Sequence, residues 1–345
     1  ERMIDLSQKG WVISFVRGAV LFALLWIFPR MNRKLWLAML AVFVLADVLP
    51  IGRQVNPVMP SQFFRKAPAA LAQLPEPRNQ YRLFHEVDWY AREEIARKYF
   101  STGAAVYWVV RNGIYPMTPV GHGVQLAMER DYDKTALLPT IAFTEAVWDL
   151  KRSGRADWRR AVMAMSNAWY YAEYRPYDAE RKRVHGRMET ARPIDFVKTD
   201  ENPRYYFADE VVQIYGKRDF VEKVASAKHS LRTAFVSQPA FAPARGVVHR
   251  VHETANTAAI DVESFGRAFL VLSVTPHKYW IVTIDGQETN PVVTNLGYQG
   301  VVVPAGRHRV DMRYRNTVVV YGAKISIVST LLLLAALVVR PRRKR

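Results

Sequence analysis

The sequence contains no cysteine, and acidic residues are few beside the basic ones. Without cysteine the chain can form neither a disulfide framework nor a thiolate metal site, although the absence does not indicate a compartment. The chain also lacks a glycine-rich phosphate loop, a HExxH zinc motif and the Ser, His and Asp order of a hydrolase triad. Short motifs therefore predict no catalytic residue and no metal ligand.

The chain carries 49 Lys and Arg against 31 Asp and Glu, a formal net charge of +18 over 345 residues. Such an excess would suit a nucleic-acid partner. The basic residues, however, cluster at Arg30, Arg33 and Lys34 and again at 340–345, and are otherwise scattered. The sequence has no RNA-recognition, zinc-finger or helix-turn-helix pattern. We therefore expect a membrane protein that binds no nucleic acid.

The run from Val318 to Val339 is apolar, with Lys324 as its only charge. About 22 residues at about 1.5 Å each match a hydrocarbon core of about 30 Å, so the run predicts a transmembrane helix. The tail from Pro341 to Arg345 is strongly basic. The flank with the excess of Lys and Arg stays in the cytoplasm, which places the residues before this helix on the outer face.

Two more apolar runs, about 11–28 and 35–51, predict a pair of transmembrane helices joined by a basic cytoplasmic turn at 29–34. From this turn the chain leaves the cell near residue 52 and returns through the last helix, so both basic clusters fall on one side. The chain begins at Glu1 without an initiator Met. We expect it to be the C-terminal part of a longer, multi-pass protein of the bacterial cytoplasmic (inner) membrane, with its large domain on the extracytoplasmic side.

The residues between the membrane segments change character near residue 200. Region 53–200 mixes strand patterns with predicted helices at 88–100, 137–150 and 157–166, and its segment 175–192 is charged and expected to be exposed. Region 201–316 consists instead of short strands at close spacing. Asp285-Gly286 is a hairpin signal, and 307–314 alternates between charged and apolar residues. The predicted fold class is a mixed membrane protein: transmembrane α-helices at 1–52 and 317–345, an extracytoplasmic α/β region at 53–200, and a C-terminal β-sandwich at 201–316.

An ordered series of short motifs precedes the final helix. They are LVLS at 270–273, Trp280, Asp285-Gly286, Asn295, the turn VPAG at 303–306, His308, Val310 and Tyr314. In this order the motifs resemble the C-terminus of the bacterial YfhO-like membrane proteins. Upstream, Asn56-Pro57 with Pro60 and Asn202-Pro-Arg204 resemble further motifs of that family, so the resemblance covers most of the chain. The chain departs from the pattern at 274–280 and at Gln299, where ligand binding would differ.

The resemblance implies a multi-span glycosyltransferase of the GT-C type. Such an enzyme takes a sugar from a polyprenyl-phosphate carrier on the outer face and passes it to a cell-envelope glycan, which the outer domain would position. The implied partners are the lipid bilayer, the carrier-linked sugar and the glycan acceptor. In such enzymes the catalytic carboxylate lies in the first outer loop, which we expect to precede this chain. No catalytic residue or cofactor is therefore assigned here, and a divalent-metal requirement of the whole enzyme stays open.

Charges within the predicted spans are candidate ligands of the carrier phosphate: Arg17, Asp47 and Lys324. In the predicted topology each lies within about 10 Å of the outer surface. Ionisable groups inside a membrane usually face a polar cavity. Arg17 and Lys324 would hold the phosphate, with Asp47 paired to one of them. The alternative is that Arg17 and Lys324 extend to the outer headgroups and Asp47 is solvated.

Aromatic residues near predicted turns are candidate sugar contacts, namely Tyr279, Trp280 and Tyr298. Each ring would stack on a sugar face, and packing in the protein core is the alternative. The aromatic run from Trp169 to Tyr174 has the same two interpretations.

Other polar residues have simpler explanations. Turn formation accounts best for Glu129, Asp131 and Asp133. Surface positions are expected for His249 and His252, and a hydrogen-bonded place in the core for His308.

The alternative function is a non-catalytic, membrane-anchored module that binds glycan or assists envelope assembly. A transporter subunit fits less well, because three spans with one large outer domain leave little room for a pathway. The sequence upstream of this chain would discriminate between enzyme and module. Further spans, with an Asp or Glu in the first outer loop, would indicate the enzyme.

Overall fold

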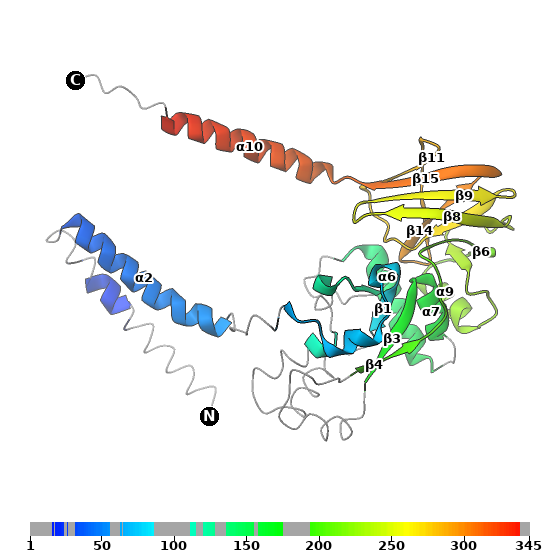
Figure 1. Cartoon of the computed structure of the whole chain (residues 1–345), viewed down its shortest axis with the longest axis horizontal. Coiled ribbons are helices and arrows are strands. Elements are labelled where there is room, and N and C mark those ends of the chain that lie inside the picture. The colour runs from blue at the N-terminus through cyan, green and yellow to red at the C-terminus, as the bar shows by residue number, and fades with distance from the viewer. Residues whose placement is uncertain are drawn as a thin grey trace. The chain divides into compact units, whose positions relative to one another are not determined.

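The computed structural model describes residues 16, 18–23, 26, 32–55, 63, 65–85, 111–114, 120–127, 136–154, 158–174 and 194–338. The chain divides into two compact units, Glu1–Ala67 and Pro68–Arg345, which are treated separately below (Figure 1). Helices and three sheets make up the described residues of the two units together. The prediction of a mixed α/β protein is therefore confirmed.

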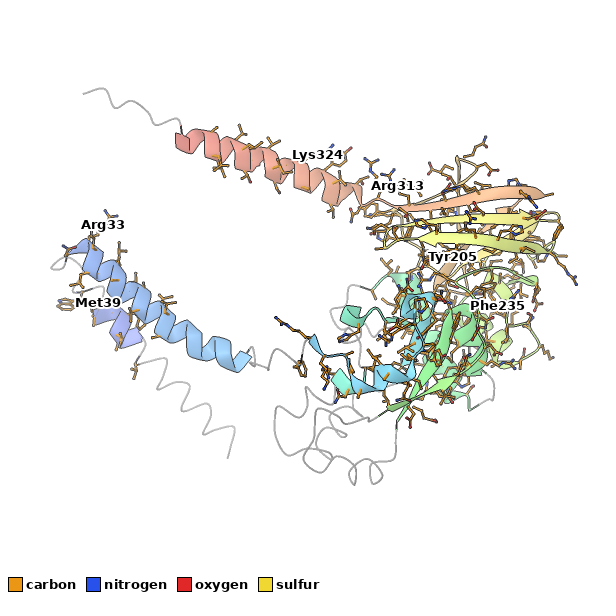
Figure 2. All side chains as sticks on the ribbon, in the orientation of Figure 1. Arg33, Met39, Tyr205, Phe235, Arg313 and Lys324 are labelled. Carbon is orange, nitrogen blue, oxygen red and sulfur yellow. The ribbon has the colours of Figure 1, made fainter. Side chains whose placement is uncertain are left out.

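The first unit contains the helix α2, Arg33–Val55. Asn32 begins it, because its Oδ1 accepts the Lys34 N–H at 2.9 Å. The predicted helical run 35–51 lies wholly within α2. Most of the apolar side chains described on this helix are exposed. Figure 2 shows them as sticks on the helix that carries the labels Arg33 and Met39. The predicted helix at 11–28 falls mostly outside the described residues, although those that are described there are helical.

The second unit opens with a four-stranded sheet. Its order is β2-β1-β3-β4, with β1 parallel to both β2 and β3 and with β4 antiparallel to β3. Between β2 and β3 lie the helices α6 and α7, which the sequence predicted at nearly the same residues. The bounds are β1 Arg82–His85, β2 Gln125–Ala127, α6 Leu138–Arg152, α7 Trp158–Met165, β3 Ala168–Tyr174 and β4 Ile194–Lys198.

A six-stranded sheet follows, in the order β5-β10-β14-β13-β7-β6. The helix α9, Lys217–Ala225, connects β6 to its parallel neighbour β7. The strands are β5 Tyr205–Phe207, β6 Glu210–Gln213, β7 Thr233–Val236, β10 Ala268–Leu272, β13 Val292–Thr294 and β14 Tyr298–Val303.

A five-stranded antiparallel sheet completes the second unit, in the order β12-β11-β15-β9-β8. Asp285 and Gly286 join β11 to β12 with φ of 51° and 82°, the left-handed pair that a two-residue hairpin requires, so the predicted hairpin is confirmed. The predicted alternation along β15 is confirmed as well, since Val310 and Met312 are buried. The strands are β8 Gly246–Glu253, β9 Thr257–Ser264, β11 Trp280–Ile284, β12 Gln287–Thr289 and β15 Gly306–Tyr314.

The described residues contain four hydrophobic clusters, two of which join the sheets to one another. In one core, Leu270 and Val301 of the six-stranded sheet pack with Ile260 and Val310 of the five-stranded sheet, so the two sheets share a buried face. The other core joins the helices to both the four-stranded and the six-stranded sheet. Its members include Phe143, Met165, Phe220, Phe235 and Tyr298. Residues from either side of position 200 therefore contribute to one continuous core.

The helix α10, Thr317–Val338, follows β15 almost without a break. Asn316 accepts the Val319 N–H through its side-chain oxygen at 3.2 Å, which caps the first turn. The apolar side chains described along α10 are exposed, for example Val318 at 66% and Leu333 at 67%. Within the part of the chain that the structure describes, Thr317–Ala335 is the helical segment long and apolar enough to cross a membrane.

Some predicted features lie elsewhere or outside the described residues. His308 faces the Val310 side of β15, but it is half-buried beside the hairpin and does not lie inside the core. At the hairpin its ring nitrogens contact the Asp285 carboxylate and the Ala305 carbonyl. The predicted helix at 88–100, the acidic turn at 129–133 and the exposed segment 175–192 fall outside the described residues.

Candidate functional site

The structure does not bring the predicted carrier-phosphate ligands into one described site. Arg17 lies outside the described residues, and Asp47 lies in α2 with its side chain outside them. Lys324 lies on α10, where its Nζ is 5.8 Å from the centroid of the exposed Tyr321 ring. Because Asp47 and Lys324 belong to different compact units, their meeting stays a prediction.

The predicted sugar contacts fall in two places. Tyr298 of β14 is buried beside α6, with its ring centroid 5.2 Å from that of Phe143. Trp280 packs instead against the core between the two larger sheets, and Tyr279 precedes it at the start of β11. Tyr298 and the Tyr279-Trp280 pair therefore cannot be assigned to one sugar site from these contacts.

Tyr298 nevertheless lines a cavity of about 220 Å³ at the junction of the four-stranded sheet, α6 and the six-stranded sheet. Arg82 lines the same cavity from β1 and donates from Nη1 to the Ser166 carbonyl at 3.1 Å. Thr140 and Thr275 add hydroxyl groups. Burial raises the pKa of Tyr298, so its hydroxyl stays protonated and can donate a hydrogen bond.

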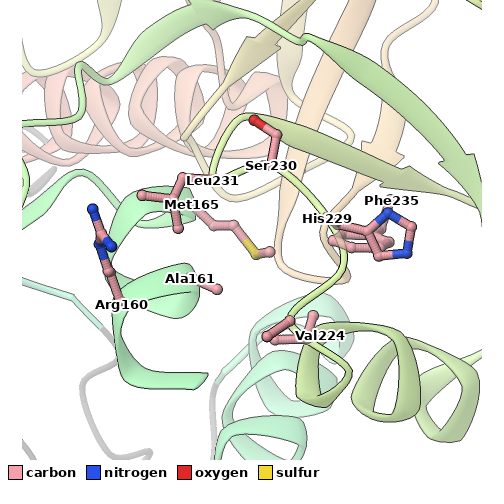
Figure 3. Close-up of a pocket in the computed structure, with 9 residues that line it drawn as sticks. Arg160, Ala161, Met165, Val224, His229, Ser230, Leu231 and Phe235 are labelled. Carbon is pink, nitrogen blue, oxygen red and sulfur yellow. The ribbon is translucent and has the colours of Figure 1, made fainter. Parts of the chain in front are cut away.

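A larger cavity, of about 310 Å³, lies between α7 and the segment that joins α9 to β7 (Figure 3). Arg160 stands on one side of it, and His229 with Phe235 on the opposite side. Its other lining residues are mostly apolar, namely Ala161, Met165, Val224, Ala227, Ser230 and Leu231. The cavity thus combines an apolar floor with a polar rim, as small-molecule sites commonly do.

Glu210 fixes the segment that carries the polar rim. Its Oε1 accepts hydrogen bonds from the Thr233 hydroxyl at 2.6 Å and the Ser230 N–H at 3.0 Å, and it lies 3.2 Å from Nδ1 of His229. Burial opposes ionisation of Glu210, but these hydrogen bonds outweigh it and lower its pKa. The Ser230 hydroxyl donates to Asp209 at 2.8 Å. Ser230 and His229 are thus held by carboxylates rather than by each other, an arrangement that suits binding rather than nucleophilic catalysis.

A neighbouring cavity of about 320 Å³ shares Arg160 and is lined by Arg159, Tyr171, Thr199 and Asp200 as well. Arg160 pairs with Asp200 through two hydrogen bonds, from Nε to Oδ2 and from Nη2 to Oδ1, the latter at 2.9 Å. The Arg160 guanidinium lowers the pKa of the Asp200 carboxyl. Arg159 lies over the Tyr171 ring, 4.9 Å from its centroid. We call the two cavities that Arg160 lines the Arg160 site.

The Arg160 site offers an aromatic ring, guanidinium groups, a carboxylate and hydroxyls beside an apolar pocket. Such groups bind the hydroxyls and anionic substituents of sugars and also the apolar parts of small ligands. Among the described residues no group of three or more His, Cys, Asp or Glu could hold a metal ion.

Sequence reasoning anticipated little of this site. Tyr171 was considered as a stacking ring, and adjacent Trp169 and Tyr170 pack on Tyr81 instead, as the packing interpretation predicted. The adjacent residues Arg159 and Arg160 on α7 are a signal in the sequence that could have indicated this site. Asp200 gave no signal, because only the fold brings it to Arg160.

The remaining histidine predictions are confirmed, since His249 and His252 are exposed on β8, where His249 binds Glu263 at 2.9 Å. Trp280 lies in β11, Asp285 in the hairpin that follows it and His308 in β15. Comparison of the chain with protein-family models, curated proteins and solved structures gives no match.

Proposed function

We propose that this chain is the C-terminal part of an integral-membrane glycosyltransferase of the GT-C type. It would act at the outer face of the bacterial cytoplasmic membrane, moving a sugar from a polyprenyl-phosphate carrier to a cell-envelope glycan. The observation that carries the proposal is the direct passage from a folded domain into an exposed apolar helix, with β15 ending at Tyr314 and α10 beginning at Thr317. An exposed apolar helix of this length is stable in lipid rather than in water. The resemblance to the YfhO-like family supplies the reaction.

In this proposal the five-stranded and six-stranded sheets form the β-sandwich of an extracytoplasmic domain, and α2 and α10 are two of its membrane anchors. The basic residues beside α2 and in the tail would remain in the cytoplasm. The domain then stands directly above the membrane, where the lipid-linked sugar is presented. This geometry supports a role in positioning the acceptor glycan.

The Arg160 site is the proposed acceptor site. Tyr171 would stack on a sugar ring, while Asp200 accepts from sugar hydroxyls and Arg159 meets an anionic substituent. The apolar cavity on the other side of Arg160 would take an acyl or methyl group of the acceptor. Tyr298 with Arg82 is a separate candidate contact, from the smaller cavity.

The carrier phosphate remains assigned to Arg17 and Lys324, with Asp47 paired to one of them. Replacing Arg17 and Lys324 each by Leu should weaken binding of polyprenyl phosphate by the protein in membranes. Replacing the exposed Lys228, far from the predicted spans, by Leu is the matched control. Unchanged carrier binding in both Arg17→Leu and Lys324→Leu would remove these residues from the proposal.

The reaction is tested with the full-length protein in native membranes and radiolabelled polyprenyl-phosphate sugars. We expect transfer of label to an envelope glycan. The variant Tyr171→Ala should raise the acceptor KM while leaving carrier binding unchanged. The control is Tyr215→Ala, which removes a ring that is 81% exposed and lines neither cavity. Absence of transfer from every carrier tested would refute the enzymatic proposal.

A non-catalytic, membrane-anchored glycan-binding or envelope-assembly module is the second candidate. The arrangement of Ser230 and His229 favours it, because each is held by a carboxylate and the two are not bonded to each other as a nucleophile and its base would be. The same assay discriminates between the two candidates. Retention of labelled glycan that depends on Tyr171, without any transfer, would identify the module.

A further inference from the structure

The end of the five-stranded sheet from which α10 leaves has an unusual surface. There β11 begins beside the end of β15, with Trp280 opposite Tyr314 in the strand register. The Arg315 N–H donates to the Tyr279 carbonyl at 2.9 Å, so the chain stays bound to the sheet until two residues before α10. We call residues 277–280 and 313–316 the helix root.

Aromatic side chains pack together within the helix root. The Tyr314 ring centroid lies 5.2 Å from that of Trp280 and 6.1 Å from that of Tyr279, and the His277 ring lies 4.8 Å from the Tyr279 ring. All of these side chains are half-buried, so each keeps part of its surface exposed. Tyr and Trp with one apolar and one wet side are typical of the boundary between water and a bilayer.

Cations surround this aromatic cluster. Lys278, Arg313 and Arg315 are exposed, and none of them forms an ion pair with a described residue. Figure 2 shows Arg313 where β15 passes into α10. Lys278 Nζ lies 5.3 Å from the Tyr279 ring centroid, an interaction that leaves its charge uncompensated. The helix root therefore carries a local positive charge.

Carboxylates pair with two other cations of the strand that leads into the helix root. Further along β15, Arg307 pairs with Glu263 at 3.4 Å and Arg309 with Asp311 at 3.1 Å. The register also places Glu253 near the helix root, but Arg204 binds this carboxylate at 2.9 Å. The cations further along β15 thus have carboxylate partners, whereas the three cations of the helix root have none among the described residues.

The depth of the helix root follows from chain length. Tyr314 and Thr317 are separated by Arg315 and Asn316, and a chain of this length spans at most about 10 Å. The headgroup layer on each side of a bilayer is about 5–8 Å thick, from about 40–45 Å in total and about 30 Å of hydrocarbon. With α10 in the bilayer, the helix root lies at the level of the headgroups.

We propose that the helix root binds the headgroups of anionic phospholipids, with Lys278, Arg313 and Arg315 on the lipid phosphates and the aromatic cluster at the interface. This inference rests on the proposed membrane insertion of α10. Each cation near an anionic surface contributes about a fivefold change in affinity. Binding at this end fixes how the five-stranded sheet stands on the outer leaflet.

The test uses the full chain in phosphatidylcholine vesicles and measures the association of spin-labelled phosphatidylglycerol relative to spin-labelled phosphatidylcholine. The variant Lys278→Gln/Arg313→Gln/Arg315→Gln should lose at least about tenfold of this preference. The control Lys228→Gln/Arg232→Gln/Arg245→Gln removes the same charge from exposed residues outside the helix root and should keep the preference. Equal preference in the two variants would overturn the proposal.

Two further arms separate the possible sources of the signal. Spin-labelled polyprenyl phosphate replaces phosphatidylglycerol in one, and a preference for it alone would overturn the proposal and assign these cations to the carrier. In the other, insertion of α10 is measured in every variant by brominated-lipid quenching of a fluorophore on a cysteine placed at Ser329. Insertion without phosphatidylglycerol preference refutes only the helix-root inference, whereas absence of insertion refutes the membrane-anchor proposal as well.

Discussion

At the scale of single residues, Asp285 joins a hairpin to the strand that leads to α10. Its Oδ1 accepts the Arg309 N–H at 2.8 Å, and its Oδ2 lies 2.6 Å from Nδ1 of His308. The Arg309 N–H and the His308 ring lower the pKa of Asp285 below its ordinary value of 3.8. In return, the Asp285 carboxylate raises the pKa of His308 above 6.5. Both shifts widen the pH range over which the pair is charged.

The Asp285–His308 pair predicts a pH window for the hairpin. Stabilisation from Asp285 is present above 3.8 and is lost as the pH falls through its lowered pKa. Stabilisation from His308 is present below 6.5 and is lost as the pH rises through its raised pKa. The variant Asp285→Asn keeps a residue that tolerates positive φ but removes the charge. Between the two pKa values, the protection of the Arg309 amide against hydrogen exchange should therefore be weaker in the variant and should not change with pH.

Hydrogen exchange of the Arg309 amide, corrected for the intrinsic effect of pH, measures this prediction. His249→Gln is the control, because it removes a histidine–carboxylate contact elsewhere on the same sheet. Parallel protection curves for the wild type and Asp285→Asn would contradict the proposed pairing.

At the scale of elements, Phe143 connects the helical layer to the six-stranded sheet. It lies on α6, with its ring 5.2 Å from Tyr298 of β14 and 6.3 Å from Phe220 of α9. A Cβ at Gly297 would lie 2.8 Å from the Phe143 Cβ, so this glycine is what lets α6 approach the sheet. A side chain at position 297 would therefore displace Phe143.

Phe143→Ala should therefore lower the free energy of unfolding by about 3–5 kcal/mol, because it opens a cavity where α6, α9 and β14 meet. Trp148→Ala is the matched control, since Trp148 lies on the same helix and is 37% exposed. We expect a cost of less than about 1 kcal/mol for the control. Denaturant unfolding of the full chain in detergent micelles measures both, and equal costs would contradict the assigned role of Phe143.

The sequence predicted individual helices and strands better than the contacts between them. Local signals located α6, α7, the Asp285-Gly286 hairpin and the alternation of β15, because each depends on periodicity or turn chemistry within a few residues. They missed β2, β12 and β13, of three residues each, and also the longer strands β4 and β14. Parallel pairing of β1 with β3 and the contact of Arg160 with Asp200 join distant residues, and no local pattern encodes them.

At the scale of the whole molecule, the proposed function depends on sidedness. The folded domain continues into α10, and the basic tail follows the helix. If α10 crosses the bilayer, the sheets and the tail must lie on opposite sides. The absence of native cysteine makes this arrangement directly measurable with single introduced thiols.

We expect Glu288→Cys, on the exposed strand β12, to react with a membrane-impermeant maleimide in intact spheroplasts. Arg345→Cys, in the tail, should react only after the membrane is permeabilised. The cysteine-free parent chain is the control for background labelling. Labelling of Arg345→Cys in intact cells, or of Glu288→Cys only after lysis, would exclude the proposed topology.

The position of β15 determines how the domain responds to mechanical load. This strand of nine residues is hydrogen-bonded to β9 on one side and to β11 on the other, and it is the strand that continues into α10. Tension between the anchor and an attached polymer would therefore pull along β15. It would load the hydrogen bonds to β9 and to β11 in shear, so that all of them resist the force together. An anchor on an edge strand would instead let the bonds open one after another. The central attachment therefore makes the domain resistant to tension applied through α10.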